Sequence, residues 1–317
     1  MGKDTKIAWC DDTFNPWVGC MKISEACKHC YAAVSTPART SRAKGLELWG
    51  PPATTARKRT SAANWKLPLR WNREAVESGV RRRVFCASLA DVFEAHPDLD
   101  VIRADPWKLV EACAGLDWLL LTKRPENIRR MVPPSWLTSW PAHVWVGTTV
   151  EDQKRAAERI HHLLAVPACV RFLSMEPLLG AVTLRSIPIG HPNAPRTCAL
   201  TGGWDVPQND GSHRQEPRIH WVIVGGESGP GARPFDLAWA RSIVGQCEEA
   251  GVPCFVKQMG DNAVETERVC PQHSDGFGCG AFCKLHRFVT ERVRFKAHHG
   301  ADPAEWPEDL RVQEFPR

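Results

Sequence analysis

The feature of this sequence that most constrains its fold is a series of short apolar runs, each followed by polar, Gly or Pro residues and then by a stretch with helical spacing. Runs rich in β-branched or aromatic residues predict strands, and apolar residues at every third or fourth position predict helices. This alternation predicts a parallel sheet. We expect helices at 105–114, 151–164 and 236–250, and strands near 83–87, 118–122, 144–148, 170–174, 220–224 and 254–257, with another before Cys20.

Length and composition agree with one α/β barrel that carries a small appendage. The chain has 317 residues, of which 43% are hydrophobic and 24% charged, which is typical of globular proteins and excludes a disordered or fibrous chain. Fourteen Trp beside a single Tyr indicate large apolar side chains for a core. Because no apolar run approaches the roughly 18 residues that span a bilayer, and the amino terminus lacks a secretory signal, we expect a cytoplasmic protein without a membrane partner.

Polar residues follow the predicted strands. In a parallel barrel the carboxyl ends of all strands open onto one face, so side chains at these positions are expected to converge on one mouth. Each residue alone also fits a second interpretation, in which a polar residue marks the point where a buried strand stops. The residues are Ser88 and Asp91, Lys123 and Arg124, Thr149 and Glu151, Glu176, Glu227, and Gln258.

Three stretches interrupt the alternation. Residues 36–83 form a basic excursion: from Arg39 to Arg83 there are twelve Lys or Arg against three Asp or Glu, so this part carries +9 and the rest of a chain of net charge +5 carries −4. Residues 187–217, rich in Pro, Gly and Asn, predict a surface loop. Residues 269–287 are dense in Cys and His.

Cys20, Cys27 and Cys30 occur with the spacing Cys-x6-Cys-x2-Cys. Three thiolates favour an iron–sulfur cluster or zinc, and a cubane held by only three Cys leaves one iron open to a non-protein ligand. The alternatives are a zinc site completed by His29 or Cys10, and plain buried thiols. A disulfide framework is disfavoured, because a cytosolic setting keeps thiols reduced.

A series of motifs runs through the chain in a fixed order. The string TKIAWCDDTFNPWVGC, followed by CKHCYA, leads on to LTKRPEN, VGTTVEDQ, FLSMEPLLG, HWVIVGGESGPGARP, FVKQMG and DPAEWPEDLRV. On these motifs, which include the three cysteines, Gly-Gly-Glu-Ser and Trp-Pro-Glu-Asp-Leu-Arg, the chain resembles a phage-associated, radical-SAM-like protein family of unassigned function. The resemblance covers most of the chain. It departs from the commonest radical-SAM spacing, Cys-x3-Cys-x2-Cys, because six residues separate the first two Cys.

The resemblance implies a partial TIM-type (β/α) barrel whose first βα loop carries a [4Fe-4S] cluster on Cys20, Cys27 and Cys30. S-adenosylmethionine (SAM) would bind the unique iron, and an electron from a donor such as flavodoxin or ferredoxin would yield a 5′-deoxyadenosyl radical that abstracts hydrogen from a substrate. The protein would position the reactive carbon and exclude solvent. The expected organisation is a barrel over 1–260, which includes the excursion 36–83 and the loop 187–217, a Cys/His metal knuckle over 261–290, and a segment over 291–317 that packs back on the barrel.

Residues at the strand ends take roles from this resemblance. Ser88 and Asp91 would contact the methionine amino group or the ribose, and Lys123 a carboxylate. The adjacent glycines of the Gly-Gly-Glu-Ser motif permit close backbone approach, although their spacing is not the dinucleotide fingerprint. The cofactor-binding set is Tyr31, Ser88, Asp91, Lys123, Thr149, Glu151, Glu176, Gly225, Gly226, Glu227 and Ser228, and the substrate set is Arg124, Arg233, Lys257 and Gln258.

A second cluster of soft ligands lies near the carboxyl terminus. It comprises Cys270, His273, Cys279, Cys283 and His286, within seventeen residues. Tetrahedral zinc takes four such ligands, and a knuckle too small for a core of its own gains folding energy from the metal. The sequence therefore favours structural zinc, with an auxiliary iron–sulfur cluster and no metal as alternatives.

The basic excursion bears on the substrate. Its cations lie among Trp49, Trp65 and Trp71. Phosphates attract such charge and indole rings stack on exposed bases, although a solvated lid anchored by Trp explains the same pattern. With the Cys/His cluster, the excursion favours a nucleotide or nucleic acid. The cations are Arg57, Lys58, Arg59, Lys66, Arg70, Arg73, Arg81, Arg82 and Arg83.

The leading hypothesis is therefore a radical-SAM enzyme that acts on a nucleotide or nucleic acid in phage base modification or repair, in the host cytoplasm if phage-encoded. The alternative is a non-catalytic nucleic-acid-binding protein stabilised by metal at both Cys clusters. A zinc hydrolase with Glu176 or Glu227 as base is disfavoured, because no His-Glu-x-x-His motif is present.

Overall fold

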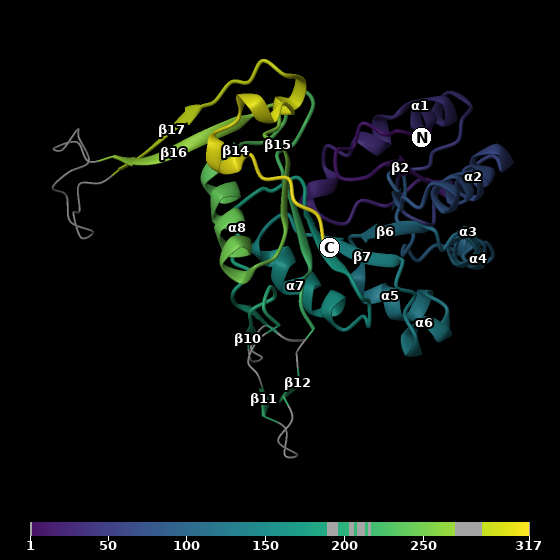
Figure 1. Ribbon diagram of the computed structural model, residues 1–317. Helices are drawn as coiled ribbons and strands as arrows, with labels where there is room; N and C mark the ends of the chain where they lie inside the picture. Colours follow the sequence, from purple (N-terminus) through teal and green to yellow (C-terminus); the bar gives the residue numbers. More distant parts are fainter. Residues whose placement is uncertain are drawn as a thin grey trace.

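A curled sheet forms the centre of the protein (Figure 1). The computed structural model describes residues 2–188, 196–202, 206–207, 213–214, 217–269 and 287–316. Except for β1, which is antiparallel to β2, the neighbouring strands of this sheet are parallel and form half of a barrel. In sheet order, the strands are β1 (Gly2–Lys3), β2 (Asp12–Thr13), β5 (Arg82–Cys86), β6 (Leu116–Thr122), β7 (Val144–Thr149), β8 (Arg171–Met175), β13 (Trp221–Gly225) and β15 (Cys254–Gln258). The prediction of a mixed α/β fold with a partial barrel is confirmed.

Helices follow the strands, and their ends carry recognisable caps. The Asp152 side chain accepts from the Arg155 amide at the start of α7, as expected for an N-cap residue. α2 begins at Ala62, where the Ser61 side chain caps it by accepting from the Asn64 amide. The helices are α1 (Thr36–Ala43), α2 (Ala62–Ser78), α3 (Pro97–Asp100), α4 (Ala104–Ala112), α5 (Ile128–Met131), α6 (Pro134–Thr138), α7 (Gln153–Leu164) and α8 (Leu237–Ala250).

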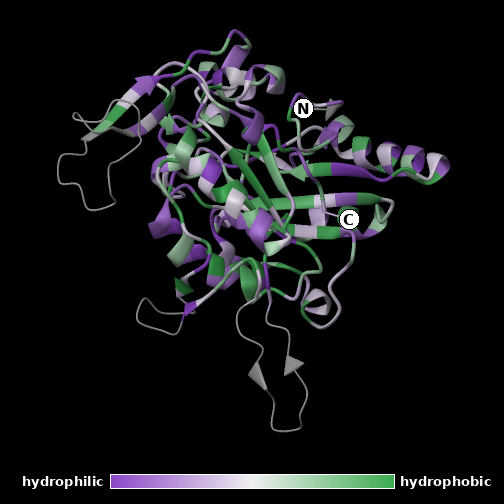
Figure 2. Ribbon diagram, turned by 60° about the vertical axis from the view of Figure 1, so that its left-hand side comes forward, coloured by the Kyte–Doolittle hydropathy of each residue, from purple (hydrophilic) through white to green (hydrophobic). Residues whose placement is uncertain are grey.

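Two apolar layers hold the half-barrel together. Alternate strand residues point to opposite faces of a sheet. Val84 and Leu120 lie on the face that packs against the helices. Phe85 and Leu119 lie on the other face, in a cluster with Trp221. Among the described residues, six Trp side chains are fully buried, which agrees with the predicted use of Trp as core volume. Figure 2 shows the apolar residues gathered in the strands.

The described part of 187–217 corrects the prediction of a surface loop. β9 (Ile187–Pro188) pairs with β10 (Arg196–Thr197), and β11 (Val206–Pro207) pairs with β12 (His213–Arg214). Ile187, Ala199 and Leu200 are fully buried in the main core. Pro and Gly content marks irregular backbone, but it does not exclude that apolar residues on that backbone reach the core.

A second, smaller sheet stands beside the barrel. It contains β14 (Phe235–Asp236), β16 (Ala263–Val269) and β17 (Arg287–Arg292), and Figure 1 shows β16 and β17 projecting away from the half-barrel. This sheet is not predicted by the pattern of apolar runs in the sequence. The predicted Cys/His knuckle, Cys270 to His286, connects β16 to β17 and lies outside the described residues.

Short elements complete the chain. β3 (Trp17–Val18) pairs with β4 (Lys58–Arg59). The 3-10 helices are η1 (Glu25–Cys27), η2 (Tyr31–Val34), η3 (Pro125–Asn127), η4 (His298–Gly300), η5 (Pro303–Glu305) and η6 (Glu308–Leu310). In the described part of the chain, none of the helices is sufficiently long and apolar to span a membrane.

Candidate functional site

One cavity of about 370 Å³ lies at the carboxyl ends of the parallel strands. It brings together the three cysteines near the amino terminus and polar residues that follow the strands, as the parallel arrangement predicts. A larger cavity of about 1090 Å³ is lined by residues such as His220 and Pro253, which precede β13 and β15 and so lie at the other end of the strands. The predicted site residues in the first cavity are Cys20, Cys27, Cys30, Tyr31, Ser88, Asp91, Lys123, Arg124, Thr149, Glu176, Lys257 and Gln258.

Backbone hydrogen bonds hold Cys20 in place. Its amide donates to Leu48 O at 3.1 Å, and its carbonyl accepts from the Gly50 amide at 3.2 Å. Gly19, directly before it, has φ +116°, and a Cβ there would lie 2.5 Å from Leu48 O. Only glycine fits such a position without strain. The first cysteine is therefore set by the chain segment around Leu48, which comes from the basic excursion.

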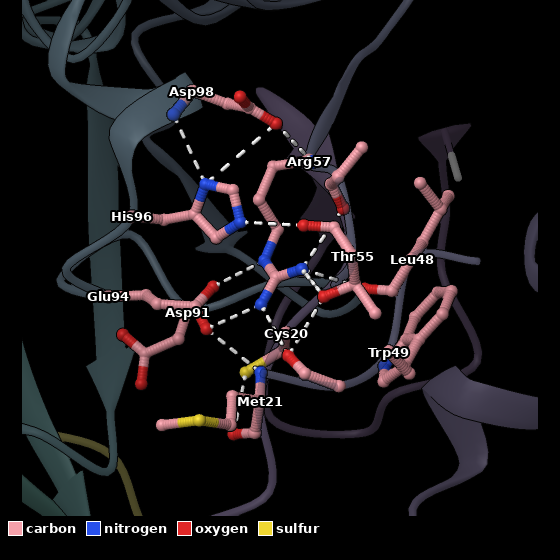
Figure 3. A network of polar contacts seen from close by, with 12 residues as sticks. Cys20, Met21, Leu48, Trp49, Thr55, Arg57, Asp91, Glu94, His96 and Asp98 are labelled. Carbon is pink, nitrogen blue, oxygen red and sulfur yellow. Dashed lines mark hydrogen bonds and ion pairs between the residues drawn. The ribbon is translucent and has the colours of Figure 1, made fainter. Parts of the chain in front are cut away.

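A buried ion pair lies behind this segment (Figure 3). Arg57 Nε donates to Glu94 Oε2 at 2.7 Å, and Arg57 Nη2 donates to Glu94 Oε1 at 2.8 Å. Both side chains are almost fully buried, at 0% and 1% exposure. Arg57 Nη1 also donates to Leu48 O, and Glu94 Oε1 accepts from the Met21 amide at 2.9 Å. One pair of charges thus ties residues 20–30, which we call the cysteine loop, to the excursion and to the segment after β5.

Arg124 and Asp91 form a second tie to the same loop. Arg124 Nη1 donates to Asp91 Oδ2 at 2.9 Å and lies 3.7 Å from Cys20 Sγ. Arg124 Nη2 donates to Met21 O at 2.9 Å. Asp91 also accepts from the Thr122 hydroxyl and the Lys123 amide. Both charged groups are therefore engaged in positioning the cysteine loop.

The electrostatic surroundings of the cysteines differ. Burial and the nearby Asp91 raise the pKa of Cys20 to about 12, against the opposing effect of Arg124. Burial also acts to raise the pKa of Cys27, but the charge of Lys123 and hydrogen bonds from Ile23 and Ser24 outweigh it and lower that pKa. A thiol with a lowered pKa more readily forms the thiolate that binds metal.

Tyr31 and Trp49 complete the wall near the cysteines. The Tyr31 hydroxyl donates to Ser88 O at 2.8 Å, and Ser88 Oγ accepts from the Asn15 side chain at 2.9 Å. Trp49 lines the cavity, and its buried Nε1 has no hydrogen-bond partner among the described residues. Since buried N–H groups are almost always paired, this donor is free for a bound group.

The far end of the cavity carries a carboxylate and two lysines. Glu176 Oε2 lies 2.8 Å from Lys257 Nζ, and Glu176 Oε1 accepts from Trp9 Nε1 at 3.0 Å. Lys123 Nζ donates to the neutral hydroxyl of Thr149 at 3.2 Å. Lys257 is therefore neutralised by its partner, whereas Lys123 forms no ion pair with any described residue.

Predicted site residues that lie outside this cavity have structural contacts. Glu151 is fully buried and accepts from Arg159 at 2.7 Å. A Cβ on Gly226 would lie 2.3 Å from Met259 O, so this glycine permits close packing of β13 and β15. Gly225 and Ser228 flank the same turn, and Ser228 is exposed. Glu151 therefore fits the second interpretation, in which a polar residue marks the point where a buried strand stops.

Glu227 and Arg233 clamp the cysteine loop from the side of β13. Arg233 Nη2 donates to Glu227 Oε1 at 2.6 Å, and Arg233 Nη1 donates to Glu25 O at 2.9 Å. His29 Nδ1 lies 3.1 Å from Glu227 Oε2. Burial acts to raise the pKa of Glu227, but the hydrogen bonds from Arg233 and His29 outweigh it and lower that pKa to about 2.

This clamp predicts an acid-sensitive part of the stability. Because the pKa of Glu227 is lower in the folded chain, the unfolded chain binds more protons between about pH 4.5 and about pH 2. The contribution of the clamp is therefore complete above pH 4.5 and is lost as the pH falls. In urea unfolding at a series of pH values, we expect the Glu227→Gln variant to lose less stability over this range than the wild type. Equal slopes for the two proteins would contradict this role of Glu227.

Sequence reasoning missed the buried ion pair and overestimated the free charge of the excursion. Arg57 is buried against Glu94, and Arg81, Arg82 and Arg83 pair with Asp117, Asp12 and Asp11, respectively. Trp71 is fully buried. No signal in the sequence separates a paired arginine from a free one. Among the named cations, Lys58, Lys66 and Arg73 are exposed and form no ion pair with a described residue.

In the described part of the chain, no group of three or more His, Cys, Asp or Glu is arranged to hold a metal ion. The second predicted set, Cys270, His273, Cys279, Cys283 and His286, falls in 270–286, outside the described residues.

The fold and the cavity define an α/β half-barrel protein whose candidate site opens at the carboxyl ends of its parallel strands. Residues 4–309 match the family described as "Protein of unknown function (DUF5131)", and the chain belongs to this family. No curated protein and no solved structure matches the chain.

Proposed function

We propose that this protein is a radical-SAM enzyme in which Cys20, Cys27 and Cys30 hold a [4Fe-4S] cluster. When bound, the cluster supplies the electron that cleaves the SAM sulfonium to give a 5′-deoxyadenosyl radical. The observation that carries the proposal is that the three cysteines line one cavity with polar residues from the ends of five parallel strands. A cubane uses one iron for each thiolate, so its cysteines surround a volume instead of meeting at the single point that one ion requires.

The donors around the cavity fit such a group. Lys123 lowers the pKa of Cys27, and Arg124 donates towards Cys20 Sγ. Hydrogen bonds to cluster sulfurs and nearby charge tune the potentials of such centres. The unpaired indole N–H of Trp49 adds a donor at the same wall.

The remaining residues divide between binding and positioning. Asp91 and Arg124 bind each other and the cysteine loop, so they position it. Lys123 keeps a positive charge without a described carboxylate partner, and it is our candidate for the methionine carboxylate. Glu176 and Lys257 present an acceptor and a donor at the far end, where we place the substrate.

The finer parts of the proposal concern partners. A flavodoxin or ferredoxin would supply the electron in the cytoplasm, and the substrate would be a nucleotide or nucleic acid. Zinc or a second cluster would bind within residues 270–286, which carry the five Cys and His ligands at the end of β16 and β17. The basic excursion of 36–83 would serve mainly to hold the cysteine loop, through Arg57 and the segment around Leu48.

Anaerobic reconstitution tests this function. The protein is loaded with iron and sulfide, and the bound iron and sulfide are counted per chain. An electron paramagnetic resonance spectrum of the reduced protein is recorded with and without SAM. We expect about four iron and four sulfide at the first site, a spectrum that SAM changes, and release of 5′-deoxyadenosine. An intact cluster that neither responds to SAM nor yields 5′-deoxyadenosine would instead support the non-catalytic binding protein.

A further inference from the structure

We propose that the β16–β17 ribbon and the stretch that follows it, residues 292–298, bind the sugar–phosphate backbone of a nucleic acid. We call these residues the ribbon surface. The inference rests on the proposed function in one respect, since it names the class of substrate that the cavity would receive. It differs from the sequence interpretation, which assigned this contact to the basic excursion.

The two faces of the ribbon carry different side chains. The register pairs Thr266 with Thr290 and Val264 with Arg292, and residues two apart in a strand share a face. The Thr266 and Thr290 hydroxyls lie 3.1 Å apart. The opposite face carries Glu265, which is bound by Arg241 of α8. The acidic face is thus turned to the body of the protein, and the hydroxyl face is turned away from it.

The stretch after β17 continues with alternating exposure. Arg292, Arg294, Lys296 and His298 are exposed, whereas the residues between them are half-buried. Val293 and Phe295, two of these intervening residues, pack against the main core. Because β17 ends at Arg292, Arg294 and Lys296 lie on irregular backbone, and their exposure leaves them open to solvent. Among the described residues, no acidic side chain forms an ion pair with Arg292, Arg294 or Lys296, although Arg292 Nη2 donates to the Asp261 carbonyl at 3.0 Å.

Two nearby acids are already engaged, whereas Glu267 and Glu291 are exposed on the ribbon face that also carries Glu265. Asp261 lies 2.7 Å from His299 Nδ1 and accepts from the Gly229 amide at 2.6 Å. Glu305 accepts from the backbone amides of Lys296 and Ala297. The cationic side chains therefore remain available for a polyanion, which is the electrostatic requirement for a phosphate backbone.

The ribbon surface adjoins the cysteine loop. A cavity of about 590 Å³ lies between Arg292, His298 and the loop 229–232. A Cβ on Gly231 would lie 4.0 Å from His29 Cε1, and His29 stands between Cys27 and Cys30 in the sequence. A strand bound along the ribbon surface would thus pass close to the proposed cluster.

The residue types favour nucleic acid over an acidic protein. Arg and Lys contact phosphates, and hydroxyl side chains such as Thr266 and Thr290 also donate to phosphate oxygens. Phe288 of β17 is 75% exposed, and an exposed aromatic ring stacks on unpaired bases.

Two matched triple variants test the inference. One replaces Arg292, Arg294 and Lys296 with Gln, and the control replaces Lys58, Lys66 and Arg73, which removes the same charge from β4 and α2. Fluorescence anisotropy measures binding of single-stranded and duplex DNA and RNA oligonucleotides at a series of salt concentrations. All six side chains are exposed, and thermal melts of each variant check that it folds.

We expect the ribbon variant to bind nucleic acid at least about tenfold more weakly at low salt. The slope of the logarithm of the binding constant against the logarithm of the salt concentration should fall in magnitude by about two, since each phosphate contact contributes about 0.7–0.9 to this slope. The control variant should change affinity by less than about twofold. Phe288→Ala should weaken single-strand binding by at least about fivefold and leave duplex binding unchanged, because only unpaired bases stack. Equal losses in the two triple variants, or no binding by the wild type at low salt, would overturn the inference.

The outcome also separates this inference from the proposed function. Release of 5′-deoxyadenosine in the absence of nucleic acid is measured for the wild type and the ribbon variant. If wild-type binding of nucleic acid depends on the ribbon surface but no 5′-deoxyadenosine is released, the proposed enzymatic function is contradicted and the ribbon surface is supported. If 5′-deoxyadenosine is released normally but the ribbon substitutions do not change nucleic-acid binding, the enzymatic function is supported and the ribbon surface is contradicted.

Discussion

Replacing Cys27 with Ser is expected to weaken cluster binding at the first site by at least about 100-fold, because loss of even an outer-shell partner costs about 10- to 100-fold in metal affinity. The reconstituted variant should therefore retain little iron and sulfide at this site. A hydroxyl is a poor substitute for a thiolate ligand. Formation of 5′-deoxyadenosine should fall to the background level. Iron and sulfide are counted per chain, and 5′-deoxyadenosine is measured after reduction with SAM present.

Cys169 provides the matched control for this experiment. It is exposed and lies just before β8, away from the candidate cavity. The Cys169→Ser variant should keep the iron, the sulfide and the release of 5′-deoxyadenosine of the wild type. If Cys27→Ser kept its iron and sulfide, or lost no more than the control, the cavity cysteines would not be cluster ligands.

Replacing Arg57 with Leu should lower the free energy of unfolding by about 3 kcal/mol, since removal of one partner of a buried ion pair leaves a buried carboxylate, which Arg124 at 3.7 Å compensates only in part. Glu94 would then keep its backbone contact to Met21 but lose both hydrogen bonds from the guanidinium. Urea unfolding of the two proteins measures the difference. The same variant should hold iron less well, because Arg57 also binds Leu48 O beside Cys20.

The exposed pair of Arg42 and Glu47 gives the comparison. Both side chains are about half exposed, at 52% and 42%, and exposed pairs contribute about 0–1 kcal/mol. Arg42→Ala should therefore change the unfolding free energy by no more than about 1 kcal/mol. The double variant Arg57→Met, Glu94→Leu should recover part of the lost stability, because it leaves no buried charge behind. A loss from Arg57→Leu no larger than that from Arg42→Ala would show that the pair does not hold the cysteine loop.

Much of the fold could be predicted, because each strand of the half-barrel is a short apolar run whose signal is local. The predicted strand near 118–122 is observed as β6, Leu116–Thr122, and the predicted helix over 236–250 as α8, Leu237–Ala250. The β16–β17 ribbon escaped prediction. Its strands carry Glu, Thr and Arg at most positions, so they lack the apolar pattern that predicts a strand. The stretch of sequence between the two strands gives no local signal that they pair.

The candidate site could be predicted in part. Residues such as Lys123 and Glu176 converge because parallel strands end at one edge, which is a consequence of topology that strand positions alone imply. Glu151 shares this placement in the sequence, but it turns to Arg159 instead of the cavity. Its direction depends on which neighbours compensate its charge, and those neighbours come from other segments.

Local information in the sequence determined the alternation of strands and helices, the order of the motifs and the trio of cysteines near the amino terminus. The tertiary structure alone decided which charges are free. Arg57 forms an ion pair with Glu94, and Arg81, Arg82 and Arg83 form ion pairs with aspartates. Arg294 and Lys296, in contrast, are exposed. The reason is physical: apolar periodicity is read within a few residues, but the partner of a charge is chosen by contacts between segments that lie far apart in the chain.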